Sequence, residues 1–433
     1  MLPHEVKNRI KQFNPWIFNP DKLKEITEKY IPQKYVVRDP ENTPIHKEQA
    51  FLAVGPRQSG KSTMVWHLLH VYLPNVMFFN MEEPLFRDIQ AVDLVELIQT
   101  EYSFIRAIFI DEAQHMNEAG LFIKGLIDMK IDIPVFVTGS SSYHLLSKTR
   151  ESLAGRATRC RLLPFSLREL LNFASPVNQA LARHLSDEIA QHQLIFGSYP
   201  GVYLSEIRDS KINILNNLVE SLILRDASDM FRIERIDAFR KLMTLLALRI
   251  GNIINISELA SLCGVNTGTI NNYIEIMEES HIIKKVLPFA GGKRREIKGA
   301  QKIFFIDNGI RNALLNSFPS NVNQVSDAGA IFENWVFSEL YKSTPFLGTI
   351  RYWRSKSKAE VDFVIEYAGK LYAIEAKYTS FKKPELNRSA HSFIEAYKPD
   401  RFIMLNLALD YDLDVRGTKV SFCTPYALLN FLY

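Results

Sequence analysis

The sequence has few cysteines, no long apolar run and no strong excess of charge, and each shortage excludes a class of protein. Only three cysteines, Cys160, Cys263 and Cys423, occur in 433 residues, and their spacing forms no CxxC motif. A disulfide framework is therefore not indicated, and a reducing, cytoplasmic compartment is expected. The N-terminal residues lack the apolar stretch of a secretory signal. No run approaches the roughly 18 apolar residues that cross a bilayer, so no membrane association is expected.

The charge balance is also mild. The formal net charge is +4, from 52 basic and 48 acidic residues. Such an excess permits contact with nucleic acid but does not require it, because binding depends on local clusters of charge. Hydrophobic residues make up 47% and charged residues 23%, as in folded globular proteins. A chain this long exceeds one ordinary core, so several domains are expected.

The pattern along the chain predicts an α/β protein in five parts. Residues 1–45 form an N-terminal arm, and residues 46–165 alternate apolar strands with helical stretches, as in a parallel sheet covered on both faces. Residues 166–235 are predicted to form a helical lid, 236–310 a winged helix, and 311–433 a further α/β domain. The strands predicted in the second part are Phe51–Val54, Val76–Phe79, Ala107–Ile110 and Pro134–Thr138.

A glycine-rich motif follows the first of these strands. Residues 55–62 fit the pattern GxxxxGK followed by Ser or Thr, and a helix is predicted directly after them, over Thr63–Leu69. Glycines let backbone N–H groups approach phosphates, and a helix N-terminus favours their negative charge. The candidate nucleotide-binding residues are Gly55, Pro56, Arg57, Gln58, Ser59, Gly60, Lys61, Ser62 and Thr63.

Two of these side chains have specific predicted roles. Lys61 is expected to reach the β- and γ-phosphates of ATP, and the Ser62 hydroxyl to ligate Mg²⁺. The alternative is a glycine-rich turn with an exposed lysine, and the strand before the motif and the helix after it make that the weaker interpretation.

Two further strand ends point to the same chemistry. The strand at residues 107–110 ends in adjacent carboxylates, of which Asp111 is expected to hold the Mg²⁺ hydration shell and Glu112 to polarise the attacking water. Another strand ends at Thr-Gly-Ser-Ser, where Ser140 is the first candidate for a sensor of the γ-phosphate. A polar strand-to-helix turn is the alternative there. Arg156 is either an arginine finger or a surface cation.

Taken in order, the motifs GPRQSGKST, FIDEAQ, TGSSS, ESLAGRA and GSYPGVY resemble the prokaryotic AAA-type P-loop ATPases that carry a C-terminal domain of unknown function. The resemblance covers most of the chain from about residue 46. The first two motifs are generic to P-loop ATPases, whereas LAGR, SYPGVY and FENWVFSEL are typical of this family. In such proteins Asp111 and Glu112 would be the Walker B pair, and residues 138–140 the sensor region.

Residues 256–280 are predicted to form a helix, a glycine-containing turn and a second helix. Asn266 or Thr267 is expected to cap the second helix. The face of this second helix that is expected to be exposed carries three glutamates, which would repel phosphates. The basic stretch Gly291–Arg295 is better placed to contact a DNA backbone as a wing. Both DNA contact and a purely structural packing role remain open.

The C-terminal part contains two strand-like stretches around a possible two-residue turn, Ala368-Gly369. With that turn, Asp362 lies opposite Glu375 and Glu360 lies opposite Lys377, all on one sheet face. Directly opposed carboxylates are destabilising unless they are neutralised. A divalent metal ion would neutralise them.

This arrangement resembles the PD-(D/E)XK nucleases, although Val361 stands where the named pattern has proline. In those enzymes Asp and Glu bind Mg²⁺, and Lys positions the attacking water. The resemblance implies metal ligands at Asp362 and Glu375, a catalytic Lys377 and a helical Glu333 that completes the site. The alternative is a relic of the fold, in which the carboxylates are solvated or paired with Lys358, Lys377 and Arg354.

The sequence therefore predicts a Mg²⁺-dependent ATPase whose ATP cycle controls binding or cleavage of nucleic acid by the C-terminal domain, with DNA as the expected partner. The alternative is a signalling or scaffold ATPase whose inactive C-terminal domain binds a protein partner. A homo-oligomer is possible.

Overall fold

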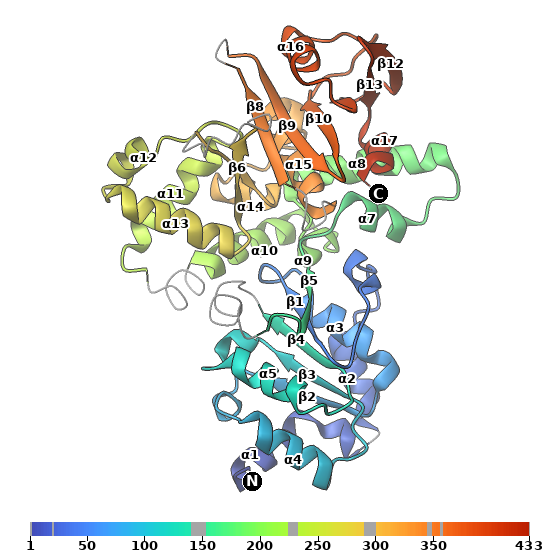
Figure 1. The fold of residues 1–433 in the computed structure, drawn as a ribbon, viewed down its shortest axis with the longest axis vertical. Coiled ribbons are helices and arrows are strands. Elements are labelled where there is room, and N and C mark those ends of the chain that lie inside the picture. Colours follow the sequence, from blue (N-terminus) through green and yellow to red (C-terminus); the bar gives the residue numbers. More distant parts are fainter. Residues whose placement is uncertain are drawn as a thin grey trace. The chain divides into compact units, whose positions relative to one another are not determined.

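The computed structural model describes residues 2–19, 21–139, 153–223, 233–289, 300–343, 349–355 and 358–432. The chain divides into two compact units, an N-terminal unit, Met1–Leu163, and a C-terminal unit, Pro164–Tyr433 (Figure 1). Both mix helices and strands, so the predicted α/β class is confirmed at that level. Among the described residues, no helix combines the length and apolar character needed to cross a bilayer.

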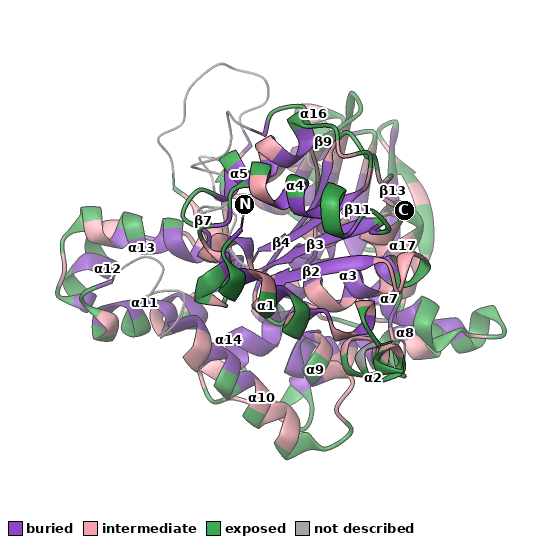
Figure 2. Ribbon diagram, turned by 90° about the horizontal axis from the view of Figure 1, so that it is seen from below, coloured by how far each residue is buried: buried purple, intermediate pink, exposed green. Residues whose placement is uncertain are grey.

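The N-terminal unit is built on a five-stranded parallel sheet of order β2-β3-β4-β1-β5. Its strands are β1 Ala50–Val54, β2 Val76–Asn80, β3 Ala107–Asp111, β4 Val135–Gly139 and β5 Ala157–Arg161. β3 and β4 are buried at every residue (Figure 2). The four predicted strands are present. β5 was not predicted, because Ala-Thr-Arg-Cys-Arg has no apolar run. Helices α3 Lys61–Leu69, α4 Ala91–Glu101 and α5 Ala119–Asp128 connect the strands.

The N-terminal arm is ordered against the edge strand of this sheet. It contains α1 His4–Phe13 and α2 Lys22–Tyr30. The Asn14 side chain accepts a hydrogen bond from Phe78 N at 2.6 Å and donates one to Phe78 O at 3.0 Å. The indole of Trp16 donates to Val76 O at 3.1 Å. These bonds satisfy backbone groups that an edge strand would otherwise expose.

The C-terminal unit begins with helices, as the sequence predicted. They are α7 Leu167–Ala174, α8 Gln179–Phe196, α9 Pro200–Tyr203, α10 Arg208–Ser221, α11 Ile236–Leu248, α12 Ile256–Cys263 and α13 Thr267–Glu279. Between α12 and α13, Gly264 has φ 65° and the Asn266 side chain accepts from Thr269 N at 2.7 Å. The helix-turn-helix geometry and its cap are therefore as predicted.

An eight-stranded sheet of order β12-β13-β11-β10-β9-β8-β6-β7 follows. Its strands are β6 Ile283–Pro288, β7 Lys302–Phe305, β8 Thr349–Arg354, β9 Glu360–Tyr367, β10 Lys370–Ala376, β11 Arg401–Leu405, β12 Tyr411–Val415 and β13 Thr418–Cys423. The remaining helices are α14 Asn308–Leu314, α15 Ala328–Ser343, α16 Arg388–Tyr397 and α17 Pro425–Leu432. β6 pairs with both β7 and β8. One sheet therefore joins the predicted winged helix, residues 236–310, to the predicted α/β domain, residues 311–433.

The GSYPGVY motif has a structural role in this unit. Asp307, which is 3% exposed, accepts hydrogen bonds from Ser198 N at 2.7 Å and from Gly309 N at 2.8 Å. Ser198 O in turn accepts from Phe165 N at 3.0 Å. The motif thus ties the start of the C-terminal unit to the turn before α14.

Candidate functional site

The glycine-rich loop lies between β1 and α3, at the carboxyl edge of the parallel sheet. Gly60 caps α3 with φ 91°, in the left-handed region that glycine adopts without strain. A side chain at Gly55 would place its Cβ 1.9 Å from Leu162 O, in the segment that follows β5. The loop therefore needs glycine at both positions, once for its backbone conformation and once for a close approach of two backbones.

Lys61 lies inside this loop and is 4% exposed. Its Nζ donates to Pro56 O at 2.9 Å and to Gly55 O at 3.1 Å. The ammonium is therefore held in the curve of the loop, next to the first turn of α3, where backbone N–H groups also favour an anion.

Side chains from three elements meet beside Lys61. Ser62 Oγ donates to Asp111 Oδ1 at 2.7 Å, and the hydroxyl of Thr138 donates to the same oxygen. Thr138 also accepts from Glu112 N at 3.1 Å. Burial raises the pKa of Asp111 to about 6, and the charge of Glu112 adds to this shift, whereas the bonds from Thr138 and Ser62 oppose it. A buried carboxylate beside a hydroxyl is a set of hard oxygen donors that suits Mg²⁺.

Glu112 projects from a left-handed backbone conformation with φ 54° and ψ 45°. Its carboxylate accepts a hydrogen bond from the Gln114 side chain. Burial lowers the pKa of the nearby His115, and its Nε2 is buried without a hydrogen-bond partner. Gln114 had no assigned role in the sequence prediction, although it belongs to the same FIDEAQ motif.

The structure separates Arg156 from this cluster. Arg156 directly precedes β5, and Ala157 pairs with Ala50, which is the first residue of β1. Arg156 thus lies at the opposite end of the strands from the loop, and its Nε donates to Asp128 Oδ1 at 2.6 Å. It does not reach the phosphate loop of its own chain. The predicted sensor Ser140 lies outside the described residues.

Arg38 contacts the glycine-rich loop, and this contact was not predicted from the sequence. This residue of the N-terminal arm is 3% exposed. Its guanidinium donates to Ser59 O at 2.9 Å and to Leu163 O at 2.5 Å. It therefore braces the phosphate loop against the segment after β5. No motif marks it, because its partners are backbone carbonyls distant in sequence.

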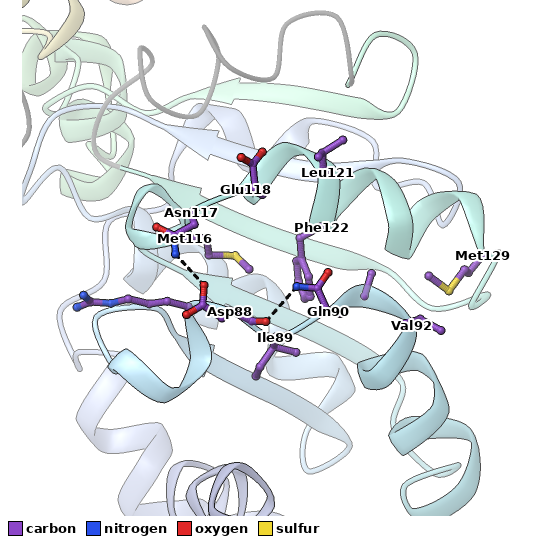
Figure 3. Close-up of a pocket in the computed structure, with 12 residues that line it drawn as sticks. Asp88, Ile89, Gln90, Val92, Met116, Asn117, Glu118, Leu121, Phe122 and Met129 are labelled. Carbon is purple, nitrogen blue, oxygen red and sulfur yellow. Dashed lines mark hydrogen bonds between the residues drawn. The ribbon is translucent and has the colours of Figure 1, made fainter. Parts of the chain in front are cut away.

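A separate cavity of about 350 Å³ is lined by residues 87–92 and by residues between Met116 and Met129 (Figure 3). Phe122 and Leu121 of α5 line it, together with Met116 and Val92. The Asn117 side chain bridges to Asp88 Oδ1 at 2.7 Å across one end. No residue of the glycine-rich loop lines this cavity, so it is distinct from the candidate nucleotide site.

In the C-terminal unit, β9 and β10 form the predicted hairpin. Its turn is Ala368-Gly369, with φ values of 50° and 75°, and the pairing runs from Lys370↔Tyr367 to Ile374↔Phe363. The predicted register is confirmed over these pairs, and continued by one residue it sets Glu375 opposite Asp362. Ala376 N donates to Asp362 Oδ2 at 2.8 Å.

Glu375 is 2% exposed. Its Oε1 accepts from Lys377 Nζ at 2.7 Å and from Asn387 Nδ2 at 2.5 Å. Its Oε2 is buried and has no hydrogen-bond partner. Burial raises the pKa of Asp362 to about 6, with the charge of Glu375 adding to the effect. Burial and the charge of Asp362 raise the pKa of Glu333, on α15, to about 8. The structure thus brings these four predicted residues together.

An unpredicted residue, Lys302, also enters this group from β7. Its side chain is 3% exposed, and its Nζ lies 2.5 Å from Glu360 Oε1 and 3.3 Å from Glu333 Oε1. The ammonium also lies 5.3 Å from the centre of the Tyr352 ring. The one signal in the sequence is a lysine at the start of a strand that is otherwise Ile-Phe-Phe, and β7 is buried at every residue.

These contacts do not leave a ready metal site. Within the described ranges, no three acidic, histidine or cysteine side chains are arranged to hold an ion. Lys302 already pairs with Glu333 and Glu360, and Lys377 pairs with Glu375 Oε1. Asp362 accepts from Ala376 N, and one oxygen of Glu375 is taken by Lys377 and Asn387. The metal-binding role of Asp362 and Glu375 stays a prediction. The basic stretch Gly291–Arg295 lies outside the part that the structure describes.

Comparison with protein families divides the chain into three matches. Residues 47–171 match a family described as an AAA domain. Residues 187–321 match a domain of unknown function (DUF8612), and residues 328–424 match another (DUF4143).

Relatives resemble most of the chain. An uncharacterized protein of Methanocaldococcus jannaschii is 26% identical over 328 residues, which cover 72% of this chain and 70% of that protein. An uncharacterized protein of Haemophilus influenzae is 21% identical over 400 residues, which cover 88% and 95%. The solved ORC2 protein of Aeropyrum pernix aligns with 68% of this chain and 89% of its own, at 12% identity and with a TM-score of 0.33. The family match and the loop geometry support a P-loop ATPase of the AAA type over residues 47–171.

Proposed function

We propose that the chain is a Mg²⁺-dependent ATPase. The observation that carries this proposal is the meeting of Lys61, Ser62, Asp111 and Glu112 at the carboxyl edge of one parallel sheet. Parallel α/β sheets bind ligands at this edge. The loop from Gly55 to Ser62 would hold the phosphates through its backbone N–H groups, and Lys61 would contact the β- and γ-phosphates.

Each side chain has a distinct task in this proposal. Ser62 and Asp111 would hold Mg²⁺, which when bound neutralises charge on the β- and γ-phosphate oxygens. Thr138 fixes the Asp111 carboxylate and the backbone of Glu112 through its two hydrogen bonds. Glu112 would orient the attacking water once its carboxylate exchanges Gln114 for that water. Ser140 as a sensor, and Arg156 as a finger supplied to a second copy of the chain, remain proposals.

The test is ATP turnover by the full chain. Glu112→Gln should lower kcat by about 10²-fold or more while nucleotide binding persists, because general bases contribute about that factor. Glu118→Gln is a matched control, since Glu118 is exposed on the same connecting segment and lines only the separate cavity. A folded wild-type chain without Mg²⁺-dependent turnover would refute the proposal.

A second function, control of nucleic acid by the C-terminal unit, is favoured by the hairpin that opposes Asp362 and Glu375. DNA is the expected ligand. If DNA binds through phosphate contacts, its affinity should fall steeply with salt, and DNA should raise ATP turnover. Salt-independent binding, or turnover indifferent to DNA, would favour the alternative of a scaffold ATPase that binds a protein partner. A cytoplasmic location and a homo-oligomer remain predictions.

A further inference from the structure

Four acidic side chains of the C-terminal unit, Glu333, Glu360, Asp362 and Glu375, form what is called here the carboxylate cluster. They come from α15, β9 and β10. Such a group is costly to bury, because each charge is desolvated and repels the others. A cluster of this kind therefore requires cations, and three basic side chains pair with it: Lys302, Arg354 and Lys377.

The most buried of these cations is the ammonium of Lys302. It pairs with Glu360 at 2.5 Å and with Glu333 at 3.3 Å, from a side chain that is 3% exposed. The residue lies outside the hairpin and the helix that supply the carboxylates, on a strand that pairs with β6. A lysine buried to this extent is retained only if its charge is compensated, so the carboxylates and Lys302 require one another.

We propose that Lys302 is the resident cation of the carboxylate cluster and occupies the position at which the cluster would otherwise bind a divalent metal ion. An ion such as Mg²⁺ or Mn²⁺ prefers oxygen ligands and needs several carboxylates at once. Two of the four carboxylates are engaged by Lys302. The charge of Lys302 also acts on Asp362: burial raises the pKa of this carboxyl, and the ammonium opposes that shift. The ammonium thus already supplies positive charge to three of the four carboxylates. On this proposal the wild-type cluster is closed to metal while Lys302 is in place.

Lys377, the other lysine of the cluster, is much more exposed than Lys302. Lys377 has a side chain that is 38% exposed, and it pairs with Oε1 of Glu375 alone. Glu375 is only 2% exposed, and its Oε2 has no hydrogen-bond partner. A buried carboxylate oxygen without a donor is a position that a metal ion can satisfy. Removing the charge of Lys302, and not that of Lys377, should therefore open the site.

The experiment measures binding of Tb³⁺ and Mn²⁺ to the full chain without nucleotide. The Tyr352 ring lies 5.3 Å from Lys302 Nζ, so Tb³⁺ at that position should emit when tyrosine is excited. Lys302→Met keeps most of the length of the side chain and removes its charge. This variant should gain one tyrosine-sensitised site that binds at least about tenfold more tightly than any such site in the wild type.

Two controls define the site. Adding Glu375→Gln to Lys302→Met should abolish the gained site, because it removes the carboxylate with the unpartnered oxygen. Lys377→Met should change metal affinity by less than about threefold. A gain in Lys377→Met equal to that in Lys302→Met would overturn the proposal, since the effect would then reflect net charge alone.

The proposal can fail even if the first variant folds poorly. Lys302→Met leaves Glu333 without its ammonium and Glu360 with Arg354 alone, at 3.6 Å. Lys302→Met/Glu360→Gln, which removes one charge of each sign, therefore serves as a second variant. It should still bind metal more tightly than wild type, and a folded variant that gains no site would contradict the proposal. Tight binding of Mn²⁺ at the cluster of the wild-type chain would also overturn it.

This inference stands apart from the ATPase proposal. Lys302 belongs to the C-terminal unit, so ATP turnover of Lys302→Met should equal that of wild type. Metal binding without DNA cleavage would refute a nuclease function but leave the role of Lys302 intact. A wild-type chain without ATPase activity would refute the ATPase proposal only.

Discussion

Gly197→Ala should cost the C-terminal unit most of its stability. Gly197 follows α8 with φ 69° and ψ −156°, a backbone conformation that glycine alone adopts readily. A Cβ at this position would lie 1.8 Å from Asp307 Oδ1. The carboxylate of Asp307 would have to move away from Ser198 N and Gly309 N, which donate to it at 2.7 Å and 2.8 Å.

The magnitude follows from two contributions. The backbone strain costs about 1–3 kcal/mol. The loss of two hydrogen bonds to a buried charged group costs about 1.5–3 kcal/mol for each bond. The total is about 4–9 kcal/mol, against a typical domain stability of about 5–15 kcal/mol. The melting temperature should therefore fall by at least roughly 10 °C, if the variant folds at all.

Thermal unfolding followed by circular dichroism and calorimetry measures this effect. Gly201→Ala is the matched control. Gly201 lies in α9 and is exposed, and its added Cβ would meet its nearest atom, in Ile214, at 3.9 Å. This control should melt within about 2 °C of wild type, because surface substitutions usually change stability by less than about 0.5 kcal/mol. A Gly197→Ala protein that melts as close to wild type as the control does would refute the reasoning about Asp307.

Three other predictions concern the loop, the candidate base and one histidine. Gly55→Ala should weaken ATP binding by about tenfold or more, measured by calorimetry, because its Cβ would lie 1.9 Å from Leu162 O; unchanged affinity would contradict the loop geometry. Glu112→Gln should bind ATP with wild-type affinity but form product slowly in a single turnover, and equal loss of binding would argue against its role as base. Burial and Lys211 lower the pKa of His192 to about 4, below its unfolded value near 6.5. Stability should therefore fall by up to about 3 kcal/mol as pH drops from 6.5 to 4, and urea unfolding of His192→Gln should show a flatter pH profile.

The sequence predicted those parts of the sites that depend on neighbouring residues. The phosphate loop follows from a strand, glycines and a helix in succession. The carboxylate pair follows from a two-residue turn, because Ala368-Gly369 fixes which residues of β9 and β10 face each other. In both cases a few consecutive residues determine the geometry.

The remaining parts depend on contacts between distant segments, which no local pattern encodes. Lys302 is separated from Glu360 by the whole of α14, α15 and β8. Arg38 donates to the backbone carbonyls of Ser59 and Leu163. Every residue type has such a carbonyl, so the sequence does not mark these partners. Arg156 lies far from the loop because β5 runs parallel to β1, and the short polar strand that sets this distance has no apolar signature.

The way in which β6 joins its neighbours has a mechanical consequence. Its first residues pair with β7, whereas its last two, Leu287 and Pro288, pair in parallel with Arg351 and Tyr352 of β8. β6 thus links the helix-turn-helix segment to the sheet that contains the hairpin with the acidic residues. A load applied to α13 would reach this short overlap as shear between β6 and β8. The ion pairs from Lys302 of β7 to Glu333 and Glu360 would carry part of the same load, because they join the two sides next to the overlap.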